Sequence, residues 1–413
     1  MSAGSPIGVS NWVSNSARSG PAAPQRLAPG GLGIATARDQ PVLSGAPLAV
    51  NKTPIKLSDG RQLTYYDTAL GARREAADGR QLSAVNSCSE LRRDPFLGDW
   101  VIYATHRQDR SYLPPATECP LCPSRNGHRT EIPAPDYEVV VFENRFPALT
   151  ASPGAELNAR ADERGGLLAA RPSAGGCEVI CYTSQHEESF AQLSHDRVSL
   201  VLAALIDRTA ELATRPGVEQ VYCFENRGRE IGVTQPHPHG QIYAYPFVTP
   251  RTERVLASVD AYFRRTQRNL FDDVLAAERV DGSRIILAAQ HWTAFVPHAA
   301  RWPYEVHCYP NRRVPDLASL STDERCELAD VQLDLLGRFS RLFPEPAPYI
   351  AAWHQAPVRR GRRHFALHLE LFTVRRTSDK LKYLAGSESG MAAFASDVVP
   401  EAAARRLREL GAG

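Results

Sequence analysis

The sequence lacks the features of a membrane or secreted protein. No part of its 413 residues approaches a run of 18 apolar side chains, and the N-terminus has no apolar stretch of the kind that directs secretion. Its eight cysteines are too few and too scattered for a disulfide framework, which favours reduced thiols or metal ligands. We therefore expect a cytoplasmic protein that does not bind membranes.

A strong net charge is also absent. The chain has 48 basic and 46 acidic residues, a net charge of +2, so no overall field draws it towards nucleic acid. A zinc-bearing nucleic-acid module is therefore a weak alternative. Arginine makes up 44 of the basic residues, so arginine abundance alone does not indicate an anion site.

The first 50 residues differ from the rest of the chain. They contain 29 glycine, proline, serine or alanine residues, one aromatic residue and one acid, which predicts a disordered tail. Beyond residue 53, short β-rich runs surround a helical apolar stripe at residues 196–214. This pattern predicts an α+β fold with mostly antiparallel sheets and packed helices. The expected strands are residues 55–57, 63–66, 101–103, 137–142, 178–182, 220–224 and 241–245.

The chain contains an internal echo. The segment EVICY at residues 178–182 recurs as EVHCY at residues 305–309, and each copy leads into an amphipathic helix, at 196–214 and 323–343. The offset of 127 residues is constant between the copies. We infer an internal duplication, with one half at residues 51–250 and the other at residues 251–413.

The sharpest local signal is His237-Pro-His239-Gly-Gln241. In an extended segment the residues at i and i+2 share a face, so both imidazoles and the Gln241 amide address one site. Gly240 would let the backbone approach a ligand closely. A nucleophile beside a neutral hydrogen-bond donor suits a phosphoryl group. The alternative for an isolated pair is a metal site or a surface feature.

Cys119-Pro-Leu-Cys122 has the spacing with which two thiolates share one tetrahedral metal. Zinc needs two more ligands, and His186 and His237 are the candidates. Four protein ligands leave no open position, so such a metal would be structural and would hold the strand that presents His239. Two ordinary buried cysteines are the alternative.

Other polar residues are candidates for binding a nucleotide. Arg107 and Arg110 are three residues apart, so in a turn both guanidinium groups could meet one pyrophosphate. Asn144 and Asn226 lie in two Phe-Glu-Asn-Arg segments that follow strands, where an amide can contact a base or a sugar. Turn-forming asparagine is the alternative.

Together these segments resemble the galactose-1-phosphate uridylyltransferase family, a branch of the histidine-triad superfamily. The resemblance runs from about residue 91 to about residue 410 and implies two similar histidine-triad-like α+β halves. Its motifs occur in the family's order, and they are CPLC (119–122), the two Phe-Glu-Asn segments, HPHGQ (237–241), WHQAP (353–357) and KYLAGSE (382–388).

The resemblance implies a double displacement between UDP-glucose and galactose 1-phosphate. His239 would attack the α-phosphorus and form a covalent uridylyl-histidine, which galactose 1-phosphate then attacks to give UDP-galactose. A neutral imidazole needs no deprotonation near pH 7, and a backbone carbonyl can hold its other N–H. Gln241 would stabilise charge on the phosphoryl oxygens. Another histidine-triad nucleotidyltransferase or a dinucleoside-polyphosphate phosphorylase is the alternative.

The resemblance also assigns binding residues. Arg107 and Arg110 would bind the nucleotide phosphates, and Lys382 and Glu388 would hold the hexose phosphate across a homodimer. The zinc ligands of the family match the four residues proposed from spacing. The positions that match nucleotide contacts are Asn144, Asn226, Gly232 and Thr234.

The chain departs from the family at a second, iron-type site built from a glutamate and three histidines. His354 and His368 fit that site, but Glu370 replaces the last histidine and Val255 stands at the glutamate position. These departures argue against a second metal. Ser387 also stands where a tyrosine often binds the sugar, which makes the hexose specificity the least determined property.

Overall fold

The computed structural model describes most of the chain after residue 47. The expected disordered tail lies outside the described residues, apart from its last three. The described ranges are 48–83, 89–109, 113–150 and 167–411.

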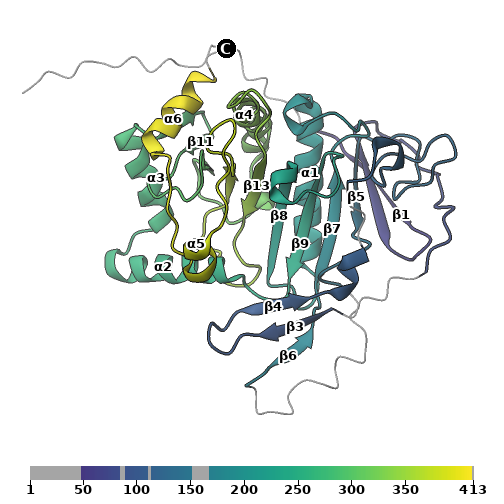
Figure 1. Ribbon diagram of the computed structural model, residues 1–413, viewed down its shortest axis with the longest axis horizontal. Coiled ribbons are helices and arrows are strands. Elements are labelled where there is room, and N and C mark those ends of the chain that lie inside the picture. Colours follow the sequence, from purple (N-terminus) through teal and green to yellow (C-terminus); the bar gives the residue numbers. More distant parts are fainter. Residues whose placement is uncertain (1–47, 84–88, 110–112, 151–166, 412–413) are drawn as a thin grey trace, which may run out of the picture. The chain divides into compact units, whose positions relative to one another are not determined.

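The described chain is built on one large and one small sheet, with helices on both faces of the large one (Figure 1). All pairings between named strands are antiparallel, so the predicted α+β class is confirmed. The large sheet contains β1 (Asn51–Lys56), β2 (Gln62–Asp67), β5 (Val139–Glu143), β7 (Gly176–Cys181), β8 (Gln220–Arg227), β9 (His239–Tyr245), β10 (Ile285–Ala288), β11 (Trp292–Phe295), β12 (Val306–Pro310), β13 (Tyr349–His354) and β14 (His368–Phe372). The small sheet contains β3 (Glu90–Arg93), β4 (Trp100–Tyr103) and β6 (Ala170–Pro172).

The order of strands in the large sheet shows the two halves. It is β1-β2-β5-β7-β9-β8-β13-β14-β12-β11-β10, so that β5-β7-β9-β8 from the first half is mirrored by β13-β14-β12-β11 from the second. The halves meet where β8 pairs with β13, from Cys223 opposite Trp353 to Arg227 opposite Tyr349. The chain therefore has the expected two-half architecture on a single continuous sheet.

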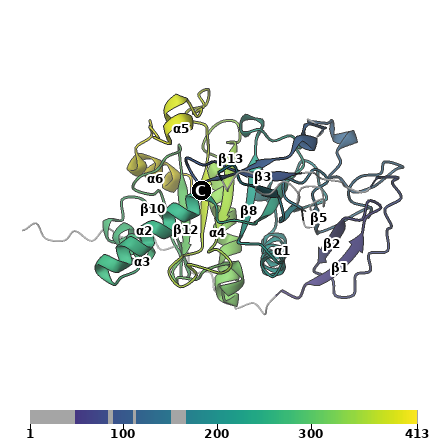
Figure 2. The ribbon, with the colours of Figure 1, turned by 90° about the horizontal axis from the view of Figure 1, so that it is seen from below.

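Six helices occur among the described residues: α1 (His195–Ala213), α2 (Pro250–Thr266), α3 (Leu270–Asp281), α4 (Thr322–Ser340), α5 (Gly386–Met391) and α6 (Pro400–Glu409). Helices α1 and α4 begin and end 127 residues apart, as the echo predicts. Each begins at a serine, because the hydroxyl of Ser194 accepts the N–H of Arg197 at 3.2 Å and that of Ser321 accepts the N–H of Glu324 at 3.3 Å. They pack against each other and cover one face of the sheet (Figure 2).

The strand part of the echo matches in letters but not in orientation. Ile180 on β7 belongs to the core beneath α1, whereas His307, its counterpart at offset 127, lies outside that core. On β12 the residues that pack beneath α4 are Val306 and Cys308. Because side chains alternate along a strand, a shift of one residue reverses the face. The offset of 127 residues therefore relates helices α1 and α4, but it does not relate the buried faces of β7 and β12.

The two halves cover the opposite face of the sheet differently. In the first half the segment containing Cys119 and Tyr137 packs there against β5 and β7. In the second half Phe271 and Leu275 of α3 pack against Phe295 and Tyr309.

No helix among the described residues has the length and apolar character needed to cross a membrane.

Candidate functional site

Strand β9 presents the predicted nucleophile. Its side chains alternate, so that His239 and Gln241 lie half-buried on one face while Gly240 and Ile242 are buried on the other. Nδ1 of His239 lies 2.8 Å from the backbone carbonyl oxygen of His237, which can accept only if Nδ1 carries the proton. This bond leaves Nε2 as the basic nitrogen. Burial also lowers the pKa of His239, which favours the neutral imidazole.

His239 and Gln241 face a cavity of about 400 Å³, within the size range of small-molecule sites. Of the other predicted residues, Asn144 and Thr234 also line it. The remaining lining residues are Pro120, Leu121, Glu131, Phe142, Arg145, Phe146, Val179 and Gln235. The structure thus brings together the predicted nucleophile, the predicted amide donor and two predicted nucleotide contacts.

Other residues predicted to contact the nucleotide do not line this cavity. Arg107 donates from Nη1 to the carbonyl oxygen of Phe146 at 3.0 Å and so supports the wall that contains Asn144. Asn226 lies on β8, and Gly232, with a φ of +81°, ends the short turn at residues 229–231. Arg110 lies outside the described residues, so its pairing with Arg107 stays a prediction.

The two residues predicted to bind hexose phosphate are close to each other but are not part of this cavity. Nζ of Lys382 lies 3.0 Å from Oε1 of Glu388, and both side chains are buried in the segment that precedes α6. Neither lines the cavity that contains His239. The role of both residues in binding hexose phosphate therefore stays a prediction.

The structure gives Gly240 a different role from the predicted one. A Cβ atom at this position would lie 2.1 Å from the hydroxyl oxygen of Tyr182 and 3.0 Å from the backbone oxygen of Phe224. Gly240 is therefore needed because a neighbouring side chain packs against the back of the strand, and the expectation that it admits a ligand is corrected.

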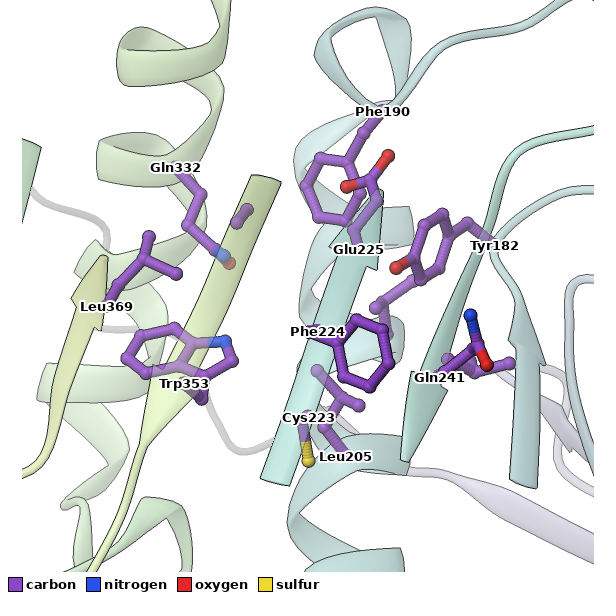
Figure 3. A pocket seen from close by; sticks show the side chains of 13 residues that line it. Tyr182, Phe190, Leu205, Cys223, Phe224, Glu225, Gln241, Gln332, Trp353 and Leu369 are labelled. Carbon is purple, nitrogen blue, oxygen red and sulfur yellow. The ribbon is translucent and has the colours of Figure 1, made fainter. Parts of the chain in front are cut away.

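A small cavity of about 30 Å³ lies near this contact, where the two halves meet. Figure 3 shows Tyr182, Glu225 and Gln241 from the first half around it, with Gln332 and Trp353 entering from the second. Glu225 accepts a hydrogen bond from the Tyr349 hydroxyl at 2.9 Å, and burial raises its pKa to about 7. Polar side chains from both halves therefore line this small cavity.

We expect Gly240→Ala to destabilise the protein by about 1 to 3 kcal/mol, the usual cost of overpacking, and to lower the activity. The added methyl group must displace Tyr182 or strand β9, and a displaced β9 moves His239 and Gln241 together. Urea unfolding and the rate of nucleotidyl exchange would measure both effects.

Removing the Tyr182 hydroxyl should relieve part of this strain. Gly240→Ala with Tyr182→Phe should be more stable than Gly240→Ala alone, because the closest remaining ring contact is 3.1 Å, to Cζ. Tyr182→Phe alone is the control. A Gly240→Ala protein as stable and as active as the wild type would show that this close contact does not constrain the strand.

Four predicted metal ligands converge on one point. One ligand atom from each of Cys119, Cys122, His186 and His237 lies within 4.8 Å of the others. Sγ of Cys122 lies 3.3 Å from Nδ1 of His186 and 3.5 Å from Nδ1 of His237. Tetrahedral zinc with ordinary bond lengths would place sulfur and nitrogen about 3.5 Å apart. The donor set therefore fits a tetrahedral cation.

The surroundings of His237 orient it for this role. Its Nε2 lies 2.8 Å from the backbone oxygen of Thr183 and 2.9 Å from the Tyr137 hydroxyl. A carbonyl oxygen accepts only from a protonated nitrogen, so Nε2 carries the proton of the neutral imidazole. The lone pair on Nδ1 then points to the metal-ligand cluster. Burial lowers the pKa of His237 to about 4 and raises that of Cys122 to about 12, so a cation would be needed to ionise the thiol.

A second polar cluster surrounds Glu370 on β14. Nε2 of His354 lies 3.3 Å from its Oε2, and Nε2 of His368 lies 3.3 Å from its Oε1. His307 on β12 lies 3.6 Å from Oε1 and contacts Glu305 at 3.0 Å. Although burial opposes ionisation, His354 and His307 hold the pKa of Glu370 well below its usual value.

Sequence reasoning missed two charged residues of the cavity. Glu131 is buried and pairs with Arg80 at 2.9 Å, and Nη1 of Arg145 approaches it at 3.7 Å. The Arg145 side chain is 44% exposed. Its place directly after Asn144 in the Phe-Glu-Asn-Arg segment was a signal for Arg145. Glu131 stands alone in the sequence, and only the fold brings it to the cavity.

The fold and site define a class of protein. Two antiparallel halves, with a His-x-His-x-Gln strand that faces a cavity of about 400 Å³, fit a nucleotidyltransferase. Two family models, described as the N-terminal and C-terminal domains of galactose-1-phosphate uridyl transferase, match residues 80–249 and 255–412. The chain belongs to the galactose-1-phosphate uridylyltransferase family.

Individual relatives agree with this assignment. The chain is 48% identical over 373 residues to a galactose-1-phosphate uridylyltransferase from Streptomyces lividans, covering 87% of this chain and 98% of the relative. It is 36% identical over 322 residues to one from Thermotoga maritima, covering 78% and 98% of the two chains. A solved uridylyltransferase structure is similar with a TM-score of 0.68 at 29% identity, covering 78% and 98%.

Proposed function

We propose that this enzyme exchanges UMP between UDP-glucose and galactose 1-phosphate through a covalent intermediate on His239. The observation that carries the proposal is the hydrogen bond from Nδ1 of His239 to the carbonyl oxygen of His237, because it leaves Nε2 available in the cavity. An imidazole held in this tautomer is a nucleophile without loss of a proton.

The proposed reaction has two displacements. Nε2 of His239 forms a bond to the α-phosphorus of UDP-glucose, and the bond from that phosphorus to glucose 1-phosphate breaks. An oxygen of galactose 1-phosphate then attacks the same phosphorus, the N–P bond breaks, and UDP-galactose leaves. The Gln241 amide donates to the non-bridging oxygens, where charge develops in both steps.

The charges around the cavity support an anionic substrate. Arg145 lines the cavity, and its guanidinium lies 3.7 Å from Glu131 and over the ring of Phe146. Asn144 and Thr234 are placed to contact the nucleotide, and Arg107 holds the wall beside them. Arg110, Asn226 and Gly232 complete the proposed nucleotide-binding set.

A structural zinc ion at Cys119, Cys122, His186 and His237 is part of the proposal. When bound, it would supply fixed cross-links and no reacting group, because four protein ligands fill its coordination. His237 would then tie the start of β9 to the turn that follows β7. The tie restrains the carbonyl of His237 that orients His239.

We further propose a cytoplasmic homodimer whose halves span residues 51–250 and 251–413. Lys382 and Glu388 support the dimer, since they pair with each other away from the cavity of their own chain. The junction of the two family models, between residues 249 and 255, supports the division. The cysteines among the described residues are free thiols, and thiols stay reduced in the cytoplasm. This supports the proposed cytoplasmic location.

A panel of donors and acceptors would test the function. UDP-glucose and ADP-glucose would each be assayed with galactose 1-phosphate, glucose 1-phosphate and inorganic phosphate. We expect UDP-glucose with galactose 1-phosphate to give the highest kcat/KM. Faster release of a nucleoside diphosphate with inorganic phosphate would identify a phosphorylase and contradict the proposal.

A further inference from the structure

The cluster around Glu370 already contains a cation supplied by the chain. Nη2 of Arg251, in the first turn of α2, lies 2.6 Å from Oε1 of Glu370. The same oxygen lies 3.3 Å from Nε2 of His368 and 3.6 Å from that of His307. A guanidinium stays charged at any ordinary pH, so this carboxylate has a permanent partner.

Helix α2 offers no acidic ligand to this cluster. Val255 lies one turn after Arg251, and residues four apart share a helix face. Its side chain packs in an apolar group with Val248, Leu256 and Phe365. The face of α2 that could contribute a carboxylate contributes instead a cation at residue 251 and an apolar side chain at residue 255.

These contacts do not fit an iron-type metal. A divalent ion bonded to Oε1 of Glu370 would lie next to the guanidinium on the same oxygen, and the two positive charges would repel in a buried setting. Glu370 is 3% exposed and the Arg251 side chain is 44% exposed, so water would screen that repulsion only from the side of the guanidinium. Metal binding would require Arg251 to leave.

We infer that Arg251 takes the place of the second metal, neutralising Glu370 and fastening α2 to β14. The wild-type protein then holds a single metal ion per chain, the zinc at the cysteine cluster. Removing the guanidinium uncovers two imidazoles and one carboxylate, from His354, His368 and Glu370, which lie within 4.8 Å of one another. Such a set binds divalent transition metals.

Metal counting on the purified, zinc-loaded protein tests this inference. Wild type, Arg251→Ala, Arg251→Lys and Arg254→Ala would each be incubated with Co²⁺, desalted and analysed for zinc and cobalt by mass spectrometry. We expect one zinc in all four and an additional cobalt, with visible absorption, in Arg251→Ala alone. Arg254, an exposed arginine on the same helix, is the matched control.

Two results would overturn the inference. One is a wild-type chain that retains a second metal and loses it in His368→Ala. The other is an Arg251→Ala protein that has wild-type far-UV circular dichroism but gains no cobalt. Should Arg251→Ala fail to fold, Arg251→Met keeps the aliphatic stem and serves as the second variant, and the wild-type count remains decisive on its own.

Discussion

His239→Ala will leave no UMP on the protein after incubation with radiolabelled UDP-glucose. The substitution removes the nitrogen that bonds to phosphorus, so exchange should fall by about a thousandfold or more, as when a covalent nucleophile is lost elsewhere. Acid hydrolyses the N–P bond, so the labelled protein should not be precipitated with acid. It should be separated from free UDP-glucose by rapid gel filtration at neutral pH.

Two further variants separate the nucleophile from the groups around it. Gln241→Ala should still accept label, with exchange slowed by about 10²–10³-fold, the cost of removing one donor to a developing charge. His239→Gly leaves a space in which added imidazole should restore some transfer. Label retained by His239→Ala, or kinetics that require both sugar phosphates to be bound at once, would move the chemistry away from this residue.

Cys119→Ser should abolish zinc binding and destabilise the first half. The substitution removes one of four ligands and breaks a cluster that joins distant segments, a cost of about 3 to 5 kcal/mol by analogy with broken buried ion pairs. Exchange should fall as well, because His237 joins the cluster to β9. Zinc content, thermal unfolding and activity would be measured together.

Cys326→Ser is the control for this prediction. Cys326 is partly exposed on α4 and lies outside the cluster, so its replacement should leave zinc content and activity unchanged. Chelation of the wild type should reproduce the effect of Cys119→Ser. Zinc content unchanged in Cys119→Ser would contradict the assigned ligand set.

Local patterns were sufficient to predict the α+β class, the seven expected strands and the two helices α1 and α4. Helices α1 and α4 and the strands expected at residues 55–57 and 63–66 lie where the sequence pattern placed them. The four-residue cluster was predictable in part because a Cys-x-x-Cys knuckle supplies two thiolates, and histidines are among the residues that complete such sites. Alternation along a strand also placed His239 and Gln241 on one face.

Properties that depend on distant segments were not predictable in this way. Nothing near Glu131 in the chain indicates that it lines the cavity, and the contact of Gly240 with Tyr182 joins two strands. The match of EVICY to EVHCY indicated the duplication but did not show which face of each strand is buried, since similar letters do not fix strand orientation. Arg251 was overlooked because one arginine among 44 has no distinguishing local signal.

The junction of β8 with β13 has a consequence for how such a chain can arise. A lone first half would expose the backbone groups of β8 as a bare edge, beside the buried side chains of Val221 and Cys223. A second identical copy, related by a two-fold axis, would satisfy that edge in the way β13 does here. Fusion of two such copies would preserve the ladder and free one of them to lose its catalytic groups.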